Sequence, residues 1–118
     1  MTSAAPEHMT TSRELLAKAQ VALDEDDLLQ ASEKGWGAAA HMVKGVAEKR
    51  CWPHNGHREL YHVVNRLPEE AASPQLRSLF SIASSLHANF YELWMPKEIV
   101  EEDLKQVKDF LSRLEELY

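Results

Sequence analysis

The chain contains 118 residues, of which 44% are apolar and 27% are charged, and its formal net charge is −6. This length suits a single domain with one core, and no apolar run approaches the roughly 20 residues that cross a bilayer. The first residues lack the basic start and apolar centre of a secretory signal, and a single cysteine allows no internal disulfide, so we expect a cytoplasmic protein. The acidic balance excludes a general nucleic-acid coat, because such coats neutralise many phosphates.

The first helix is predicted to begin at Thr11, after a disordered tail formed by residues 1–10. This tail is small, polar and interrupted by a proline, so it offers no face that could be buried. Thr11 and Glu14 have the spacing of a capping box, in which each side chain satisfies a free amide at the helix start. Apolar residues then recur at helical spacing: Leu15, Leu16, Ala19, Ala22 and Leu23. Residues 11–118 should form one folded domain.

A second, longer helix is predicted from Asp27 to Arg50. The acidic residues 24–27 suit its positive N-terminal end, and the residue before Pro53 is disfavoured in a helix. The helix contains three glycines: Gly35, Gly37 and Gly45. Each glycine costs about 1 kcal/mol relative to alanine in a helix interior. We therefore expect either a tight crossing with a neighbouring helix or a face that self-associates.

A third helix is predicted over residues 57–67, after a tight connector formed by residues 51–56. Asn55 or Gly56 can cap this helix, and Glu59 lies within reach of the capping position. The connector therefore forces the second and third helices to lie side by side.

Prolines punctuate the remainder of the chain. Pro68 should end the third helix, Ser73 should cap a fourth helix that starts with Pro74, and Pro96 should open a fifth. The expected core positions of the last three helices are Leu60, Val63, Val64, Leu67, Leu76, Leu79, Phe80, Ala83, Leu86, Phe90, Tyr91, Ile99, Val100, Leu104, Val107, Leu111, Leu114 and Tyr118. Because every helix has one apolar side and the connections are short, we predict an all-α, antiparallel up-and-down bundle of four to five helices.

The charge is distributed unevenly along the chain. Between Lys44 and Arg66 there are five basic and two acidic side chains, although the whole chain is acidic. The same stretch holds histidines 54, 57 and 62. This basic, histidine-rich island is the strongest functional asymmetry in the sequence.

Two segments together resemble the HEPN domains, named for higher-eukaryote and prokaryote nucleotide binding. The alanine-rich second helix carries the pair Glu33-Lys34, and His57-Arg-Glu-Leu60 follows after a short loop. Residues 86–91, Leu-His-Ala-Asn-Phe-Tyr, are similar to the aromatic fourth helix of that group. The resemblance spans about residues 11–117 and extends to the small archaeal and bacterial PaREP-like branch. It implies a helical bundle, homodimers, and roles in RNA cleavage, in toxin–antitoxin pairs or in nucleotide binding beside a nucleotidyltransferase partner.

Ribonucleases of the HEPN group carry an arginine, then four to six residues, then a histidine. Arg50 and His57 have six intervening residues but span the connector, whereas Arg58 and His62 have three and share one helical side. A histidine can accept the proton of a ribose 2′-hydroxyl, and an arginine can hold the phosphate. The residue after each arginine, Cys51 or Glu59, departs from the polar residue that this group favours.

From these residues we predict that the protein binds a nucleotide or single-stranded RNA. We expect no robust catalysis and no cofactor. Aromatic rings such as Trp52 could stack on bases. The candidate binding residues are Arg50, His54, His57, Arg58, Tyr61 and His62. The alternatives are a metal-independent endoribonuclease and a structural or interaction protein that partners a nucleotidyltransferase.

A metal site and a purely structural interpretation are two further readings of the same stretch. Cys51, His54, His57 and His62 include ligands that zinc favours, but their spacing matches no structural zinc pattern, so we predict no metal. In the structural interpretation, the histidines cap a helix or lie exposed, the arginines pair with carboxylates and Trp52 holds the connector. Two further expectations concern residues of the bundle itself. His41 and His87 should occupy polar positions on or beside the core, and Trp36, Phe90 and Trp94 should pack together.

Overall fold

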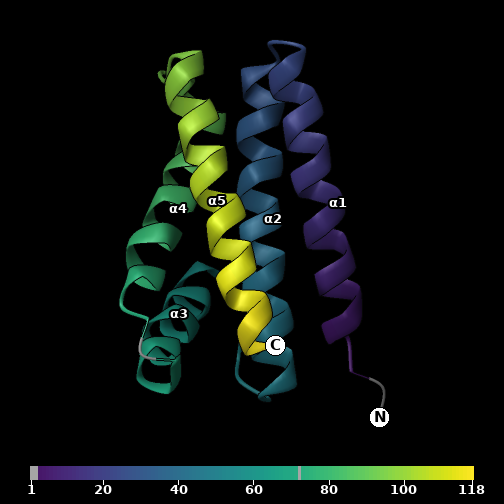
Figure 1. The fold of residues 1–118 in the computed structure, drawn as a ribbon, viewed down its shortest axis with the longest axis vertical. Coiled ribbons are helices and arrows are strands. Elements are labelled where there is room, and N and C mark those ends of the chain that lie inside the picture. The colour runs from purple at the N-terminus through teal and green to yellow at the C-terminus, as the bar shows by residue number, and fades with distance from the viewer. Residues whose placement is uncertain (1–2, 72) are drawn as a thin grey trace.

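The computed structural model describes residues 3–71 and 73–118. Five helices follow one another along the chain: α1 (Ala5–Asp24), α2 (Leu28–Lys49), α3 (His57–Ala71), α4 (Gln75–Glu92) and α5 (Lys97–Leu117). Every regular element in these two described ranges is a helix, so the predicted all-α bundle is confirmed. Figure 1 shows the long helices side by side, with the shorter α3 beside the lower part of α4. None of the described helices is long and apolar enough to cross a membrane.

Helix α2 lies at the centre of the bundle and contacts each of the other four helices. Asp27 caps its N-terminus, because its side chain accepts a hydrogen bond from the amide of Gln30 at 3.1 Å. The largest fully buried side chains come from all helices except α1: Met42, Val43, Val46, Val63, Val64, Leu67, Leu76, Phe80, Leu86, Val100, Phe110 and Leu114. Since α2 supplies a buried surface to every neighbour, its position determines where the other helices can pack.

The glycines of α2 permit close packing within the chain. A Cβ atom on Gly37 would lie 3.0 Å from Leu15 Cδ1, and one on Gly45 would lie 3.0 Å from Met9 Sδ, both in α1. Between these points, the buried Ser12 hydroxyl donates a hydrogen bond to the Ala38 carbonyl at 2.6 Å. Of the two roles that the sequence left open, the structure shows a tight intramolecular crossing.

The first helix begins at Ala5 and not at Thr11, so the expected disordered tail is wrong for residues 5–10. Ala5 is only 1% exposed, because its backbone packs against Gly45. The amide of Ala4 also donates to Glu48 Oε1 at 3.4 Å. The tertiary contact with α2 therefore stabilises helical turns that the local sequence does not favour. Residues 1 and 2 of the predicted tail lie outside the described residues.

Two helix boundaries near prolines differ from the expectation. Helix α3 continues through Pro68, and α4 begins at Gln75 without a hydrogen bond from the Ser73 side chain to the helix backbone. A proline in the last turn removes one amide donor, but its fixed φ still suits a helix, so the turn can be completed. At the other end of α3, the expected contact is present: Glu59 Oε1 accepts from the amide of Asn55 at 2.6 Å.

A buried asparagine shapes the elbow between α4 and α5. Asn89 Oδ1 accepts hydrogen bonds from the amides of Trp94 and Met95, both at 2.9 Å, and Asn89 Nδ2 donates to Ser32 Oγ at 2.9 Å. Leu93 adopts a left-handed conformation with φ 47°. This path buries Met95 and leaves Trp94 52% exposed. The expected packing role of Trp94 is therefore wrong.

Further core assignments also need correction. Tyr91 and Ile99 were expected in the core but are 72% and 46% exposed, respectively, whereas Phe110 is fully buried. Tyr91 lies on the outer side of α4, since Asn89 and Met95 at the same end of that helix are buried, and Phe110 lies one position before the predicted apolar residue Leu111. Apolar spacing locates the buried side of a helix but not its margins, where a residue can turn to either side.

The close approach of α1 to α2 can be tested at Gly45. In Gly45→Leu, the new side chain must displace the first turns of α1, so we expect the free energy of unfolding to fall by about 1–3 kcal/mol. Chemical denaturation monitored by circular dichroism measures this change. Gly56→Ala is the control, because a Cβ atom there meets no atom within 4 Å. Equal stability of Gly45→Leu and the wild type would contradict the packing described for residues 5–10.

Candidate functional site

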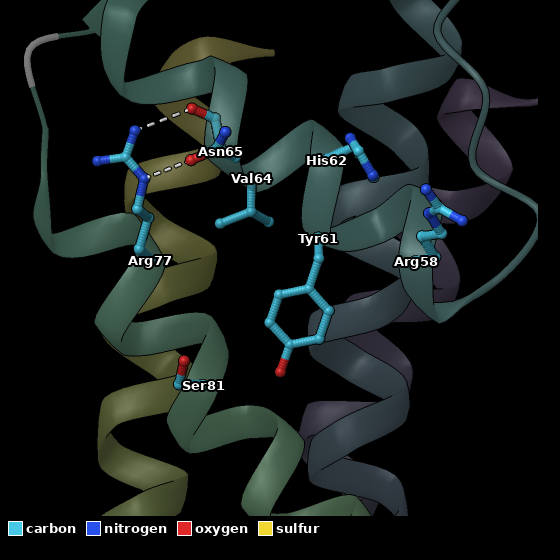
Figure 2. A pocket seen from close by; sticks show the side chains of 7 residues that line it. All are labelled: Arg58, Tyr61, His62, Val64, Asn65, Arg77 and Ser81. Carbon is cyan, nitrogen blue, oxygen red and sulfur yellow. Dashed lines mark hydrogen bonds between the residues drawn. The ribbon is translucent and has the colours of Figure 1, made fainter.

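An open groove of about 520 Å³ lies between α3 and α4. Its lining residues are Arg58, Tyr61, His62, Val64, Asn65, Arg77 and Ser81. Figure 2 shows Arg77 and Ser81 on one side, Arg58 and His62 on the other, and Tyr61 between them. Three of the six predicted binding residues are thus brought together, and α4 adds a second arginine that the sequence analysis did not select.

Hydrogen bonds hold the polar side chains of this groove in place. The Tyr61 hydroxyl donates to Ser84 Oγ at 2.6 Å, and the Tyr61 ring packs edge-on against Phe80 at 4.7 Å between centroids. Arg77 donates from Nε to Asn65 Oδ1 at 2.8 Å and from a terminal nitrogen to the Asn65 carbonyl at 3.1 Å. The groove therefore presents an ordered tyrosine and an arginine whose guanidinium orientation is set by its neighbour.

A second groove of about 500 Å³ lies on the other side of α3, against the connector. Arg58 and His62 line this groove too, together with Trp52 and Arg66. The Arg66 guanidinium carbon lies 3.8 Å from the centroid of the Trp52 ring, within the range of a cation–π contact. Trp52 is partly buried against the core, which agrees with its expected role of holding the connector. Arg58 and His62 consequently form a ridge between two grooves.

The other predicted arginine, Arg50, lies elsewhere. Its guanidinium donates to the carbonyls of Val46 at 3.3 Å and Leu117 at 2.9 Å. It therefore helps to satisfy the C-terminal end of α5, where a positive charge is favoured. The left-handed residue Cys51, with φ 58°, turns the chain away immediately afterwards. The pairing of Arg50 with His57 across the connector, suggested by their spacing, is thus not formed.

His57 is exposed but rests on an aromatic cluster at the start of α3. Its ring stacks on Trp36 at 4.8 Å between centroids with an angle of 8°, and lies 4.9 Å from His87. Trp36 also packs against Phe80, so its main partners differ from the expected Phe90 and Trp94. Burial lowers the pKa of His87, and the nearby His57 lowers that pKa further. His87 thus occupies a half-buried place beside the core, as expected.

A second histidine cluster joins α1, α2 and the connector. The Nδ1 atoms of His8 and His41 are 3.0 Å apart, His8 packs edge-on against His54, and His54 Nε2 lies 2.7 Å from Glu48 Oε2. Burial lowers the pKa of both His8 and His41, with a further lowering by Lys44. The hydrogen bond from His54 lowers the pKa of Glu48. The sequence does not reveal this cluster, because His8 falls within the predicted tail.

The ligand set weighed for zinc is divided between these places. His54 binds Glu48, His57 stacks on Trp36, and His62 lines the two grooves. In the part of the chain that the structure describes, no three or more cysteine, histidine or acidic side chains are grouped so that they could hold a metal ion.

The lowered pKa values of His8 and His41 make folding stability depend on pH. Below about pH 6.5 the unfolded chain binds protons that the folded histidines resist, so stability is complete above this pH and is lost as the pH falls toward the folded-state pKa values. We expect urea denaturation to show a loss of stability as the pH falls below about 6.5. The loss should be smaller in His8→Gln, which removes one of the two facing imidazoles.

His62→Gln is the matched control, because it removes an exposed imidazole from another helix. An unchanged pH dependence in His8→Gln would show that the His8 and His41 pair does not carry the effect. The remaining dependence in that variant reports on His41 and His87, whose pKa values are also lowered.

Comparison with known proteins gives a family and a fold. Residues 7–111 match the family described as the archaeal PaREP1/PaREP8 family, and the chain therefore belongs to it. A crystal structure of a Sulfolobus solfataricus protein is similar, with a TM-score of 0.81 at 19% sequence identity. The match covers 91% of this chain and 95% of that one, so the same fold is shared over nearly the whole domain. No curated protein matches the sequence at a significant level.

Proposed function

We propose that this PaREP1/PaREP8 protein binds nucleotides or single-stranded RNA in the groove between α3 and α4. The observation that carries the proposal is an open groove of about 520 Å³ that Arg58 and Arg77 line from opposite sides, with Tyr61 between them (Figure 2). Guanidinium groups bind phosphate through paired hydrogen bonds, and an exposed tyrosine offers a base a surface for stacking. In an acidic chain, this combination favours a local anion site.

The proposed site uses Arg58, Tyr61 and His62 from the six residues that the sequence predicts. Arg77 is added because it lines the same groove from α4 and its guanidinium is oriented by Asn65. Arg50, His54 and His57 do not belong to this phosphate-binding groove, since each has another principal contact. We also propose that the chain belongs to the wider HEPN group and forms a homodimer. The resemblance of the sequence to that group is the reason for choosing RNA as the ligand.

Ribonuclease activity is a second candidate function, favoured by the shared position of Arg58 and His62. Both side chains line both grooves, so a phosphate beside Arg58 would lie on the ridge that also carries His62. His62 could then accept the proton of the 2′-hydroxyl as its oxygen bonds to phosphorus and the bond from phosphorus to the 5′-oxygen breaks. Arg58 would stabilise the negative charge on the phosphate oxygens, and water would supply the proton that the leaving 5′-oxygen takes up. This chemistry needs no metal ion.

Binding is tested with a fluorescently labelled, single-stranded RNA of mixed sequence and a fluorescence anisotropy titration. We expect Arg58→Ala combined with Arg77→Ala to weaken binding by at least about tenfold, because two phosphate partners are removed. The logarithm of the affinity should also depend less steeply on the logarithm of the salt concentration, by about 0.7 for each phosphate that is no longer neutralised.

Arg13→Ala is the matched control for Arg58→Ala and for Arg77→Ala, each titrated as a single substitution. Arg13 is exposed on α1 and pairs with Glu115 of α5, outside both grooves, so its removal changes the charge by one unit at another place. Equal weakening by Arg13→Ala would mean that only net charge matters. A wild type that binds neither RNA nor free nucleotide would refute the proposal and favour the interaction protein with a nucleotidyltransferase partner.

Cleavage is measured in parallel by following the same RNA on a denaturing gel in the presence of a chelator. If His62 acts as the base, His62→Ala should abolish product formation while RNA binding is largely retained. Products that persist in His62→Ala would exclude this residue as the catalytic base.

A further inference from the structure

The face that carries the groove continues along α4 beyond the groove itself. Arg77, Ser81, Ser84, His87 and Tyr91 follow one another at spacings of three or four residues, which places them on one side of the helix. All five residues are at least partly exposed. We name these five residues the α4 stripe.

Residues of α3 lie beside this stripe at successive levels. Asn65 contacts Arg77, Tyr61 contacts Ser84, and His57 contacts His87. The two helices run antiparallel, so moving from Asn65 to His57 on α3 corresponds to moving from Arg77 towards Tyr91 on α4. The groove and the aromatic cluster of His57 therefore form one continuous face.

The two ends of this face differ in chemistry. At one end lies Arg77, held by Asn65, and at the other lie Arg58 and the rings of His57, His87 and Tyr91. Tyr91 is 72% exposed and packs edge-on against His87 at 5.3 Å between centroids. The buried Trp36 lies flat beneath His57. Neighbouring rings already restrict the rotation of these side chains. A base that stacks on them therefore immobilises few additional torsions, which lowers the entropic cost of binding.

The length of the face limits the size of its ligand. From Arg77 to Tyr91, α4 rises by about 21 Å at 1.5 Å per residue. A stacked nucleic-acid strand advances about 3.4 Å per nucleotide, so this face matches about six nucleotides and far exceeds a mononucleotide. Bases must also be unpaired to offer their faces to His57 and Tyr91.

We propose that the ligand is an unpaired RNA segment of several nucleotides, with phosphates at Arg58 and Arg77 and bases stacked on His57 and Tyr91. This inference rests on the proposed function and adds to it the strand length and a second group of binding residues. His57 thereby returns to the ligand surface as a stacking residue, in a place separate from the phosphate contacts.

The experiment compares the affinities of adenosine monophosphate and of oligoadenylates of two, four, six and eight nucleotides, by calorimetry or competition against a labelled octamer. We expect affinity to rise steeply up to about six nucleotides and then to level off. A blunt RNA duplex of the same length should compete at least about tenfold less well, because its bases are stacked on each other.

Substitutions then separate the two ends of the face. Tyr91→Ala and His57→Ala should each weaken hexamer binding by roughly fivefold or more, as expected when one base stack is removed. They should leave dinucleotide binding at Arg77 almost unchanged, since a dinucleotide bound there does not reach these two rings. Tyr91→Phe should retain the wild-type affinity, because stacking does not use the hydroxyl. Tyr118→Ala is the matched control, because it deletes a tyrosine ring at the end of α5, outside this face. Circular dichroism confirms that each variant is folded.

The possible outcomes distinguish this inference from the proposed function. If the mononucleotide binds as tightly as the hexamer, or if Tyr91→Ala and His57→Ala bind the hexamer normally, the extended site is refuted while the groove remains a nucleotide site. Duplex RNA that competes as well as the single strand also refutes it. If no ligand of any length binds, the proposed function itself fails.

Discussion

The close packing of α1 against α2 is the contact on which the rest of the bundle depends. Gly37 and Gly45 let the two helices approach so closely that Leu15 and Met9 occupy the space of absent side chains. The buried hydrogen bond from Ser12 to Ala38 ties the backbones together at the same interface. Because α1 covers this glycine side, the other sides of α2 remain available for α3, α4 and α5. The conformational cost of glycine in a helix is thus offset by packing.

In the folded bundle, the residues of the basic island are separated into two groups with different contacts. Arg50 satisfies carbonyl groups at the end of α5, and His54 joins Glu48 beside the first turns of α1, so both stabilise the meeting of helix ends. Arg58 and His62 instead point from the outer side of α3, where they line two grooves. Basic residues that are close in the sequence therefore either stabilise the bundle or line a surface groove. The direction in which the backbone leaves α2 determines which of the two each residue does.

The face between α3 and α4 gains its chemistry from residues that are far apart in the sequence. Tyr61 meets Ser84, Asn65 orients Arg77, and His57 lies on Trp36, a residue of the central helix. Each contact reduces the freedom of a side chain before any ligand arrives, which lowers the entropic cost of binding. A rigid core beneath an exposed row of rings and arginines is consistent with recognition of an irregular, flexible ligand.

Local spacing and short motifs were enough to predict the number and type of the helices, the apolar side of each, the cap at Glu59 and the resemblance to a PaREP-like branch. They could not predict the start of α1, since Ala5 is helical only because α2 offers a place to bury it. Nor could they group the site, because spacing along one chain does not show that Arg77 and Arg58 line the same groove or that Arg50 turns away. Those relations depend on tertiary packing, since it alone brings distant turns of different helices to the same level.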